Sequence, residues 1–225
     1  MNRYWLALLA MLCVGSATAQ DLATVAITMP QSGCALTANE SVTVWLFNYG
    51  PTLPAGSTFN VAYSIGASVP VTENVVLGGS LLRNSRLAYT FTTPADLSTP
   101  GNYTLDATVN LAGDINPTNN THSAYAVTNW ANSVGGTVSG PAGPTLNGSL
   151  TLSGHTGAVL EWQHSDDGNH RWRRLVNATT SQTFAALREH TAFRALVRNG
   201  PCAPVLSTSQ LVLSSDPIFY SGLEP

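Results

Sequence analysis

The sequence predicts an all-β protein made of two tandem β-sandwich domains, and three observations support this prediction. The 225 residues are enough for two domains of about 100 residues each. Only 9% of the residues are charged, against about a quarter in typical proteins, and Thr, Ser, Asn and Gly supply the polarity. This composition favours strands and turns over helices. Apolar and polar residues also alternate after Tyr103, as in a strand with one buried face.

The segment around Tyr103 gives the most detailed prediction. Its apolar positions fall on every second residue and are Tyr103, Leu105, Ala107, Val109 and Leu111. Pro100 and Gly101 form a turn directly before it. A tyrosine at the entry of a strand after such a turn is typical of a tyrosine corner, in which the phenol hydroxyl ties a loop to the sixth strand of a sandwich.

Residues 20–128 are predicted to form the first sandwich. Seven short strands are expected, at 22–28, 41–47, 59–65, 71–77, 87–91, 103–111 and 121–127. Turn signals rich in Pro, Gly and Asn separate these strands. Seven strands at this spacing indicate an Ig-like fold.

Several short motifs occur in order along this domain. They are Pro-Gln-Ser-Gly-Cys (30–34), Asn-Tyr-Gly (48–50), Pro-Ala-Gly-Ser (54–57), Ala-Asp-Leu-Ser (95–98), Gly-Asn-Tyr (101–103) and Gly-Asp (113–114) with Asn119-Asn120. Together they resemble the CARDB domain, an Ig-like module of secreted bacterial proteins that is named for cell adhesion. The resemblance implies a sandwich, a role in adhesion and no catalytic residues.

Residues 129–136, rich in Asn, Ser and Gly, are predicted to be a linker, and Trp130 within it is expected to pack between the domains. Residues 137–215 are predicted to form a second Ig-like sandwich. Its strands are expected at 149–153, 159–164, 172–176, 182–186, 191–197 and 205–213. Trp162 shares a strand face with Leu160 and is expected to be the core tryptophan.

Motifs of this second domain resemble an Ig-like repeat of secreted bacterial surface proteins. They include Leu-Thr-Leu-Ser-Gly (150–154), Leu-Glu-Trp-Gln (160–163) and Asn-Gly-Pro-Cys (199–202). Residues 165–172 also resemble an Asp-box hairpin, Ser-x-Asp-x-Gly-x-x-Trp. Asn169 replaces its glycine and tolerates the same left-handed conformation. A single Asp-box predicts a structural turn and no further role.

The two ends of the chain differ in composition from the predicted domains. Residues 1–19 are predicted to be a signal peptide, with Arg3 before an apolar run at 5–14 and a cleavage pattern at Ala17-Thr18-Ala19. No later segment is apolar enough to span a membrane, so a periplasmic or extracellular protein is expected. The tail at 216–225 resembles the Ile-Phe-x-x-Gly-Phe-Glu-Pro ending of many exported proteobacterial proteins, with Leu223 in place of Phe. It is either a sorting signal or a frayed end.

Only two cysteines, Cys34 and Cys202, remain after signal cleavage. Exported thiols tend to pair. Cys34 falls in the first turn of the first domain and Cys202 in the last hairpin of the second, and both places face the junction of two tandem sandwiches. An inter-domain disulfide that holds the domains at a fixed angle is therefore predicted. Two buried free thiols, or a disulfide to another chain, are the alternatives.

Charge differs between the two domains. Residues 21–128 hold two arginines against six acids, whereas residues 129–215 hold six arginines against four acids. The candidate ligand-binding residues are Arg171, Arg173, Arg174, Arg194 and Arg198. Arg171 and Arg173 are expected on one strand face, and Arg194 and Arg198 on another. Such a set could hold an anionic polysaccharide through carboxylate or sulfate groups. The alternative is that these arginines only solvate the strands.

Oxygen-bearing side chains gather in one predicted loop at Asp114, Asn116, Asn119 and Asn120. The loop could hold calcium, or its Asn and Asp side chains could simply satisfy the backbone of a turn. His164 and His170 flank Asp166 and Asp167, again either as a metal site or as a strand-end turn. No metal site is assigned, and no cofactor is expected.

No recognised catalytic or metal-binding motif occurs, and no pair of carboxylates suits hydrolysis, so no catalytic residue is nominated. With a net charge of −3 and no lysine, nucleic-acid binding is not expected. The prediction is a secreted, non-catalytic binding or adhesion protein of the bacterial surface or extracellular space. A cell-surface polysaccharide or an envelope protein is the expected partner. The alternative is an accessory structural module of a larger envelope assembly, without a ligand of its own.

Overall fold

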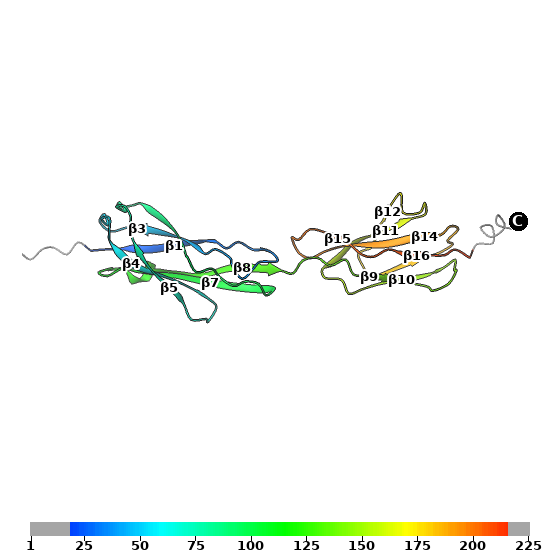
Figure 1. The fold of residues 1–225 in the computed structure, drawn as a ribbon, viewed down its shortest axis with the longest axis horizontal. Helices are drawn as coiled ribbons and strands as arrows, with labels where there is room; N and C mark the ends of the chain where they lie inside the picture. Colours follow the sequence, from blue (N-terminus) through cyan, green and yellow to red (C-terminus); the bar gives the residue numbers. More distant parts are fainter. Residues whose placement is uncertain (1–18, 216–225) are drawn as a thin grey trace, which may run out of the picture. The chain divides into compact units, whose positions relative to one another are not determined.

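The computed structural model describes residues 19–215 and is built from strands (Figure 1). Within these residues the one helical element is a short 3₁₀ turn, η1 (Pro117–Asn119). No helix in the described part of the chain is long and apolar enough to cross a membrane. Apart from Ala19, the predicted signal peptide lies outside the described residues, as does the predicted tail at 216–225.

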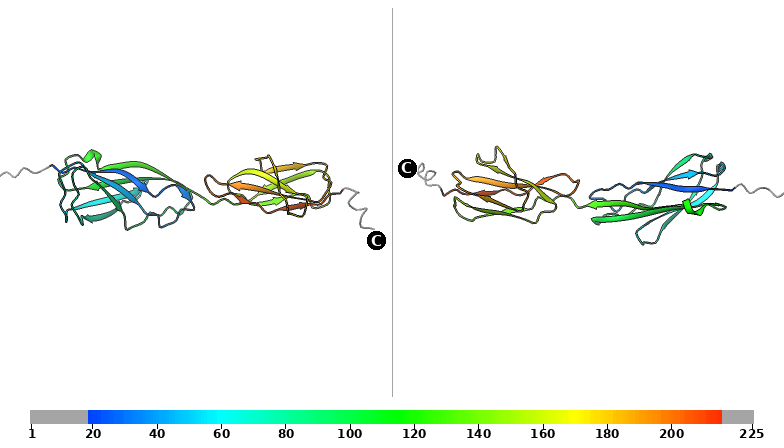
Figure 2. Two further views of the ribbon diagram at one scale, coloured as in Figure 1. Left: turned by 90° about the horizontal axis from the view of Figure 1, so that it is seen from above. Right: turned by 180° about the vertical axis from the view of Figure 1, so that it is seen from behind.

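Two sheets form the first sandwich (Figure 2). One has the order β1-β3-β6 and the other β2-β8-β7-β4-β5. All seven predicted strands are present, as β1 (Leu22–Met29), β3 (Thr43–Asn48), β4 (Thr58–Ile65), β5 (Val71–Val76), β6 (Arg86–Thr90), β7 (Gly101–Asn110) and β8 (Thr121–Trp130). The short strand β2 (Gly33–Cys34) was not predicted, and it pairs in parallel with the end of β8.

The first core follows the predicted alternation. On β7, Leu105, Ala107 and Val109 are buried, and Leu111 is buried just beyond its end. The core-facing residues of β3 and β4 are Val44, Leu46, Phe59, Val61 and Tyr63. Because successive residues of a strand point to opposite faces, this period-two pattern places the core between the two sheets.

The tyrosine corner is confirmed. The Tyr103 hydroxyl donates a hydrogen bond to the carbonyl oxygen of Thr99, 2.5 Å away, four residues upstream. This bond fastens the loop before β7 to the first residues of the strand.

Tyr103→Phe is expected to lower the free energy of unfolding by about 1 kcal/mol, because it removes one hydrogen bond and keeps the ring. Urea denaturation measures the change. Tyr49→Phe is the matched control, since that half-exposed hydroxyl has no recorded hydrogen bond among the described residues. Equal losses in the two variants would mean that the corner does not stabilise the domain.

The second sandwich has sheets of order β13-β10-β9 and β12-β11-β14-β15, with β16 also paired to β14. The elements are β9 (Thr137–Ser139), β10 (Gly148–Ser153), β11 (Ala158–Ser165), β12 (Arg173–Leu175), β13 (Ser181–Phe184), β14 (Thr191–Arg198), β15 (Val205–Leu206) and β16 (Gln210–Val212). Strand β9 was not predicted. The single strand expected at 205–213 is wrong, because Ser207 breaks it by bonding to the backbone of Ala195.

Trp162 is completely buried and is the core tryptophan, as predicted. Its indole Nε1 donates to the carbonyl oxygen of Thr179 at 2.9 Å. The prediction that Leu160 shares the core-facing side of the strand with Trp162 is wrong, because a bulge between Val159 and Glu161 shifts the register of β11. Val159 therefore joins the core, and Leu160 is half-buried.

The contacts between Cα atoms divide the chain into two compact units. Among the described residues, one contains 19–28, Thr43–Phe91 and Asp106–Tyr125, and the other contains Met29–Val42, Thr92–Leu105 and 126–215. Asn129 and Trp130, which were assigned to the linker, are the last two residues of β8.

Candidate functional site

The register of three neighbouring strands brings two candidate arginines into one row. Gln163 on β11 lies opposite Arg174 on β12 and also opposite Arg194 on β14. Adjacent strands are about 4.8 Å apart, so the backbones of the two arginines are separated by roughly 10 Å. Arg171 precedes β12 and lies outside the strands, whereas Arg198 is the last residue of β14.

The side chains of this row form a continuous polar chain. Arg174 Nε contacts Glu161 Oε2 at 2.5 Å, and Gln163 Nε2 donates to Glu161 Oε1 at 2.8 Å. Arg194 Nε in turn donates to Gln163 Oε1 at 2.8 Å. Glu161 and Gln163 thus bridge the two arginines and hold both guanidinium groups in place.

Arg194 also stacks on an aromatic ring. Its Cζ lies 3.8 Å from the centre of the Trp172 ring. Burial lowers the pKa of Arg194, and the ring face offsets part of the cost of holding the charge there. We call Gln163, Trp172, Arg174 and Arg194 the arginine surface. Arg173 is not part of it, because consecutive residues of a strand point to opposite faces.

The Asp-box turn leads the chain into β12, and the predicted structural turn is confirmed. Asp167 Oδ1 accepts hydrogen bonds from the hydroxyl of Ser165 (2.7 Å) and from the backbone N–H groups of His170 (3.1 Å) and Arg171 (2.9 Å). These hydrogen bonds lower the pKa of Asp167, and the bond from the N–H of Arg171 has the largest effect. Asn169 takes the left-handed conformation, with φ of 73°.

The five candidate arginines differ in their partners. Arg173 and Arg174 pair with carboxylates, Arg173 with Asp166 at 3.3 Å, yet both side chains remain more than 60% exposed. The guanidinium groups of Arg171 and Arg198 have no recorded partner among residues 19–215, and both residues are exposed. Exposed ion pairs contribute only about 0–1 kcal/mol, so an incoming carboxylate or sulfate could replace Asp166, whereas Glu161, with a side chain only 14% exposed, is expected to keep Arg174.

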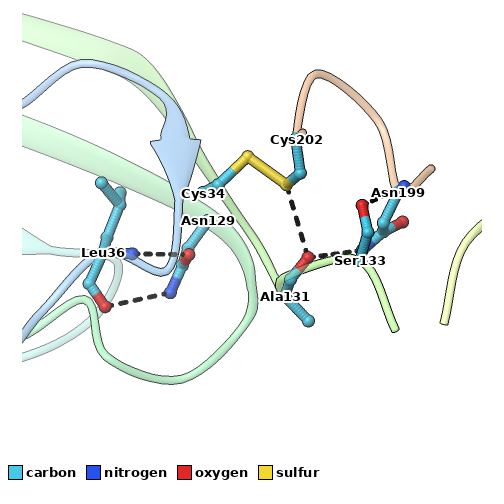
Figure 3. Close-up of a disulfide and its surroundings, with 7 residues drawn as sticks. All are labelled: Cys34, Leu36, Asn129, Ala131, Ser133, Asn199 and Cys202. Atoms are coloured by element: carbon cyan, nitrogen blue, oxygen red, sulfur yellow. Dashed lines mark hydrogen bonds between the residues drawn. A yellow bond between two sulfur atoms is a disulfide. The ribbon is translucent and has the colours of Figure 1, made fainter. Parts of the chain in front are cut away.

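Cys34 and Cys202 form a disulfide, as predicted (Figure 3). Their Cα atoms lie 5.7 Å apart, within the range that a disulfide requires. Sγ of Cys202 lies 3.4 Å from the carbonyl oxygen of Ala131, and the Asn199 amide donates to that same oxygen at 2.8 Å. The segment after β8 is therefore bound to the hairpin that carries Cys202.

Buried polar contacts hold the Cys34 side of the bond. Asn129 is 1% exposed, and its Oδ1 accepts a hydrogen bond from the N–H of Leu36 at 2.9 Å. Its Nδ2 donates to the carbonyl oxygen of Leu97 at 2.6 Å. On the other side, Gly200 packs so closely against Trp130 that a Cβ atom would lie 2.7 Å from the indole.

The loop between β7 and β8 brings the four oxygen-bearing residues together. Asp114, Asn116, Asn119 and Asn120 meet the start of β1, where Asp114 Oδ2 accepts a hydrogen bond from the N–H of Leu22 at 3.1 Å. In the described part of the chain, no group of three or more His, Cys, Asp and Glu side chains is placed to hold a metal ion.

Sequence reasoning missed the contributions of Glu161, Gln163 and Trp172 to the arginine surface. Their contacts depend on which residues face each other across β12, β11 and β14, and the bulge in β11 changes that register. The separation of Trp172 and Arg194 along the sequence does not predict that their side chains stack.

Comparisons with known proteins find a family that matches part of the chain and several solved structures. A family described as "Domain of unknown function (DUF8696)" matches residues 131–215. No curated protein matches the chain.

Among solved structures, the solution structure of a CARDB domain from Pyrococcus furiosus is 24% identical and covers 49% of this chain and 94% of its own, with a TM-score of 0.34. A crystal structure of the same domain, in complex with di-metal ions, is 22% identical, with coverages of 49% and 88% and a TM-score of 0.32. Titin domains A168–A170 are 14% identical, with coverages of 87% and 68% and a TM-score of 0.39.

Proposed function

We propose that the protein is exported and acts as a non-catalytic binding protein, whose second sandwich holds an anionic polysaccharide on the arginine surface. One observation carries the proposal, namely the row Arg174–Gln163–Arg194 across three strands, with Arg194 stacked on Trp172. The disulfide supports export, because such bonds persist in oxidising compartments.

The arginine surface suits an extended acidic ligand. Guanidinium groups bind carboxylate and sulfate through two parallel hydrogen bonds, and both classes of group occur on acidic polysaccharides. Arg194 is held by Gln163 and Trp172, so it loses little freedom on binding. The Arg174 side chain is 66% exposed, so its other guanidinium N–H groups can bind an acidic group of the ligand while Nε stays on Glu161. A protein that binds a surface polysaccharide in this way would attach to the cell exterior, which is an adhesive function.

The double variant Arg174→Gln/Arg194→Gln is expected to bind an acidic polysaccharide about tenfold more weakly, because two charge-assisted contacts are lost. Binding of the purified protein to acidic and neutral polysaccharides, measured by calorimetry at low and high salt, tests this. Added salt is expected to weaken binding further, since the contacts are exposed.

The control is Arg83→Gln/Arg86→Gln, which removes two exposed arginines from the first sandwich and changes the net charge equally. It is expected to bind like the unmodified protein. Equal weakening in both doubles, or no binding to any acidic polysaccharide, would overturn the proposal. The second result would favour an accessory module of an envelope assembly.

A further inference from the structure

Three aromatic side chains follow one another on the outward face of β3, the central strand of the sheet β1-β3-β6. Trp45 and Phe47 alternate with the buried residues Val44 and Leu46, so they point away from the core. Tyr49 continues this row directly after the end of the strand. We call Trp45, Phe47 and Tyr49 the aromatic face.

The aromatic face is open to solvent. Tyr49 is 46% exposed, and Trp45 and Phe47 are half-buried. On the neighbouring strand β6, Ala88 lies opposite Trp45 and Arg86 lies opposite Phe47, and both β6 residues are exposed. No other element of the described chain therefore packs over this side of the sheet. Exposed apolar side chains that cluster, unlike those scattered singly, mark interaction sites.

Local contacts hold two of the three rings in place. The ring centres of Phe47 and Tyr49 lie 4.4 Å apart, with 48° between the ring planes. The N–H of Tyr49 donates to the carbonyl oxygen of Asp21 at 2.9 Å. Asn48, between the two rings in sequence, is buried, and its Nδ2 donates to the carbonyl oxygen of Pro51 at 2.8 Å. Because the turn is fixed before a ligand arrives, binding to it costs little conformational freedom.

A polar depression adjoins the aromatic face at Tyr49. It has a volume of about 380 Å³, within the range of small-molecule sites, and its lining includes Tyr49, Asp21, Asn116 and Asn119. Nδ2 of Asn119 donates to Asp21 Oδ1 at 2.8 Å and so orients that carboxylate. Within residues 19–215, no hydrogen bond is recorded for Asp21 Oδ2, for Nδ2 of Asn116 or for the Tyr49 hydroxyl. These three groups are available to a ligand in the depression.

Aromatic rings beside unpaired donors and acceptors match the chemistry of a sugar. The C–H groups on one side of a sugar ring pack against an aromatic ring, and each sugar hydroxyl both donates and accepts hydrogen bonds. Charge favours a neutral sugar over an acidic one. Residues 21–128 hold two arginines against six acids, and the carboxylate of Asp21 lines the depression, so an acidic group would be repelled there.

We propose that the aromatic face and the depression beside it form a second binding site, in the first sandwich, for a neutral oligosaccharide. Sugar rings stack on the three aromatic side chains, while Asp21 and Asn116 bind sugar hydroxyl groups in the depression. All of these residues belong to the same compact unit, so the site is complete without the second sandwich. It is separate from the arginine surface and takes a different class of sugar.

Calorimetric titration of the purified protein with three neutral hexasaccharides tests the proposal. They are the hexamers of β-1,4-linked glucose, β-1,4-linked N-acetylglucosamine and α-1,4-linked glucose. At least one is expected to bind, with an affinity that added salt leaves unchanged, because no charge is paired. Binding by none of the three would overturn the proposal. Loss of acidic-polysaccharide binding, or its sensitivity to salt, concerns only the arginine surface, so the two proposals fail independently.

Four variants locate the site. Trp45→Ala is expected to weaken binding of the hexasaccharide about tenfold, because a large contact area is lost, whereas Trp45→Phe keeps a ring and is expected to retain most of the affinity. Asn116→Ala, a change in a surface turn, is expected to weaken binding several-fold through the lost donor. Trp172→Ala is the matched control, because it removes another half-buried tryptophan, from the second sandwich. Unchanged affinity in Trp45→Ala and Asn116→Ala, or a tenfold loss in Trp172→Ala, would overturn the assignment.

Discussion

Trp162→Ala is expected to lower the free energy of unfolding of the second sandwich by about 4 kcal/mol, the range for removing a buried aromatic side chain. Trp162 is completely buried, among residues that include Leu150, Phe193 and Val197. Its removal would leave a cavity that strands held by hydrogen bonds can close only in part. It would also take the donor from the carbonyl oxygen of Thr179.

Urea denaturation followed by far-ultraviolet circular dichroism measures this loss. Trp172→Ala is the matched control, because that tryptophan is half-buried and packs against Arg194 on the outer face. We expect the control to lose about 1 kcal/mol or less, the usual scale for a partly exposed site. A loss below about 1 kcal/mol in Trp162→Ala itself would show that the residue is not central to the core.

Cys34→Ser/Cys202→Ser is expected to lower the free energy of unfolding by about 2–4 kcal/mol, the usual contribution of a disulfide. The bond joins residues 168 positions apart, so its loss frees a long loop in the unfolded chain. The native contacts of Asn129 and Asn199 near the bond remain and limit the change in the folded state.

Peptide mapping without reductant tests the bond directly and is expected to recover a linked Cys34–Cys202 peptide. Reductant is expected to lower the free energy of unfolding of the unmodified protein and to leave that of the double variant unchanged. The double variant is therefore the control for effects of the reductant other than on this bond. Two alkylatable thiols in protein purified from the exported fraction would contradict the bond.

The parts of the fold that were predicted correctly depend mostly on patterns between residues close in sequence. The alternation after Tyr103 specified both β7 and its buried face, because a strand has a period of two residues. The Ser165–Trp172 motif specified its turn down to the left-handed Asn169, because those hydrogen bonds join residues close in sequence. Where prediction was wrong, as at Leu160 and Ser207, a bulge or a contact with a neighbouring strand changed the local pattern.

The candidate functional residues likewise divide into those that the sequence identified and those that only the tertiary structure brought together. The sequence alone determined the class of fold and the excess of arginine in the second domain, since both depend on composition or short-range order. It predicted the pairing of Cys34 and Cys202 and left two alternatives open, between which the structure decided. Only the tertiary structure decided that Arg174 and Arg194 share a row through Gln163, and that Leu22 meets the Asp114 loop. Those contacts arise from strand pairing and loop closure between distant segments, and no local pattern of residues encodes the register that produces them.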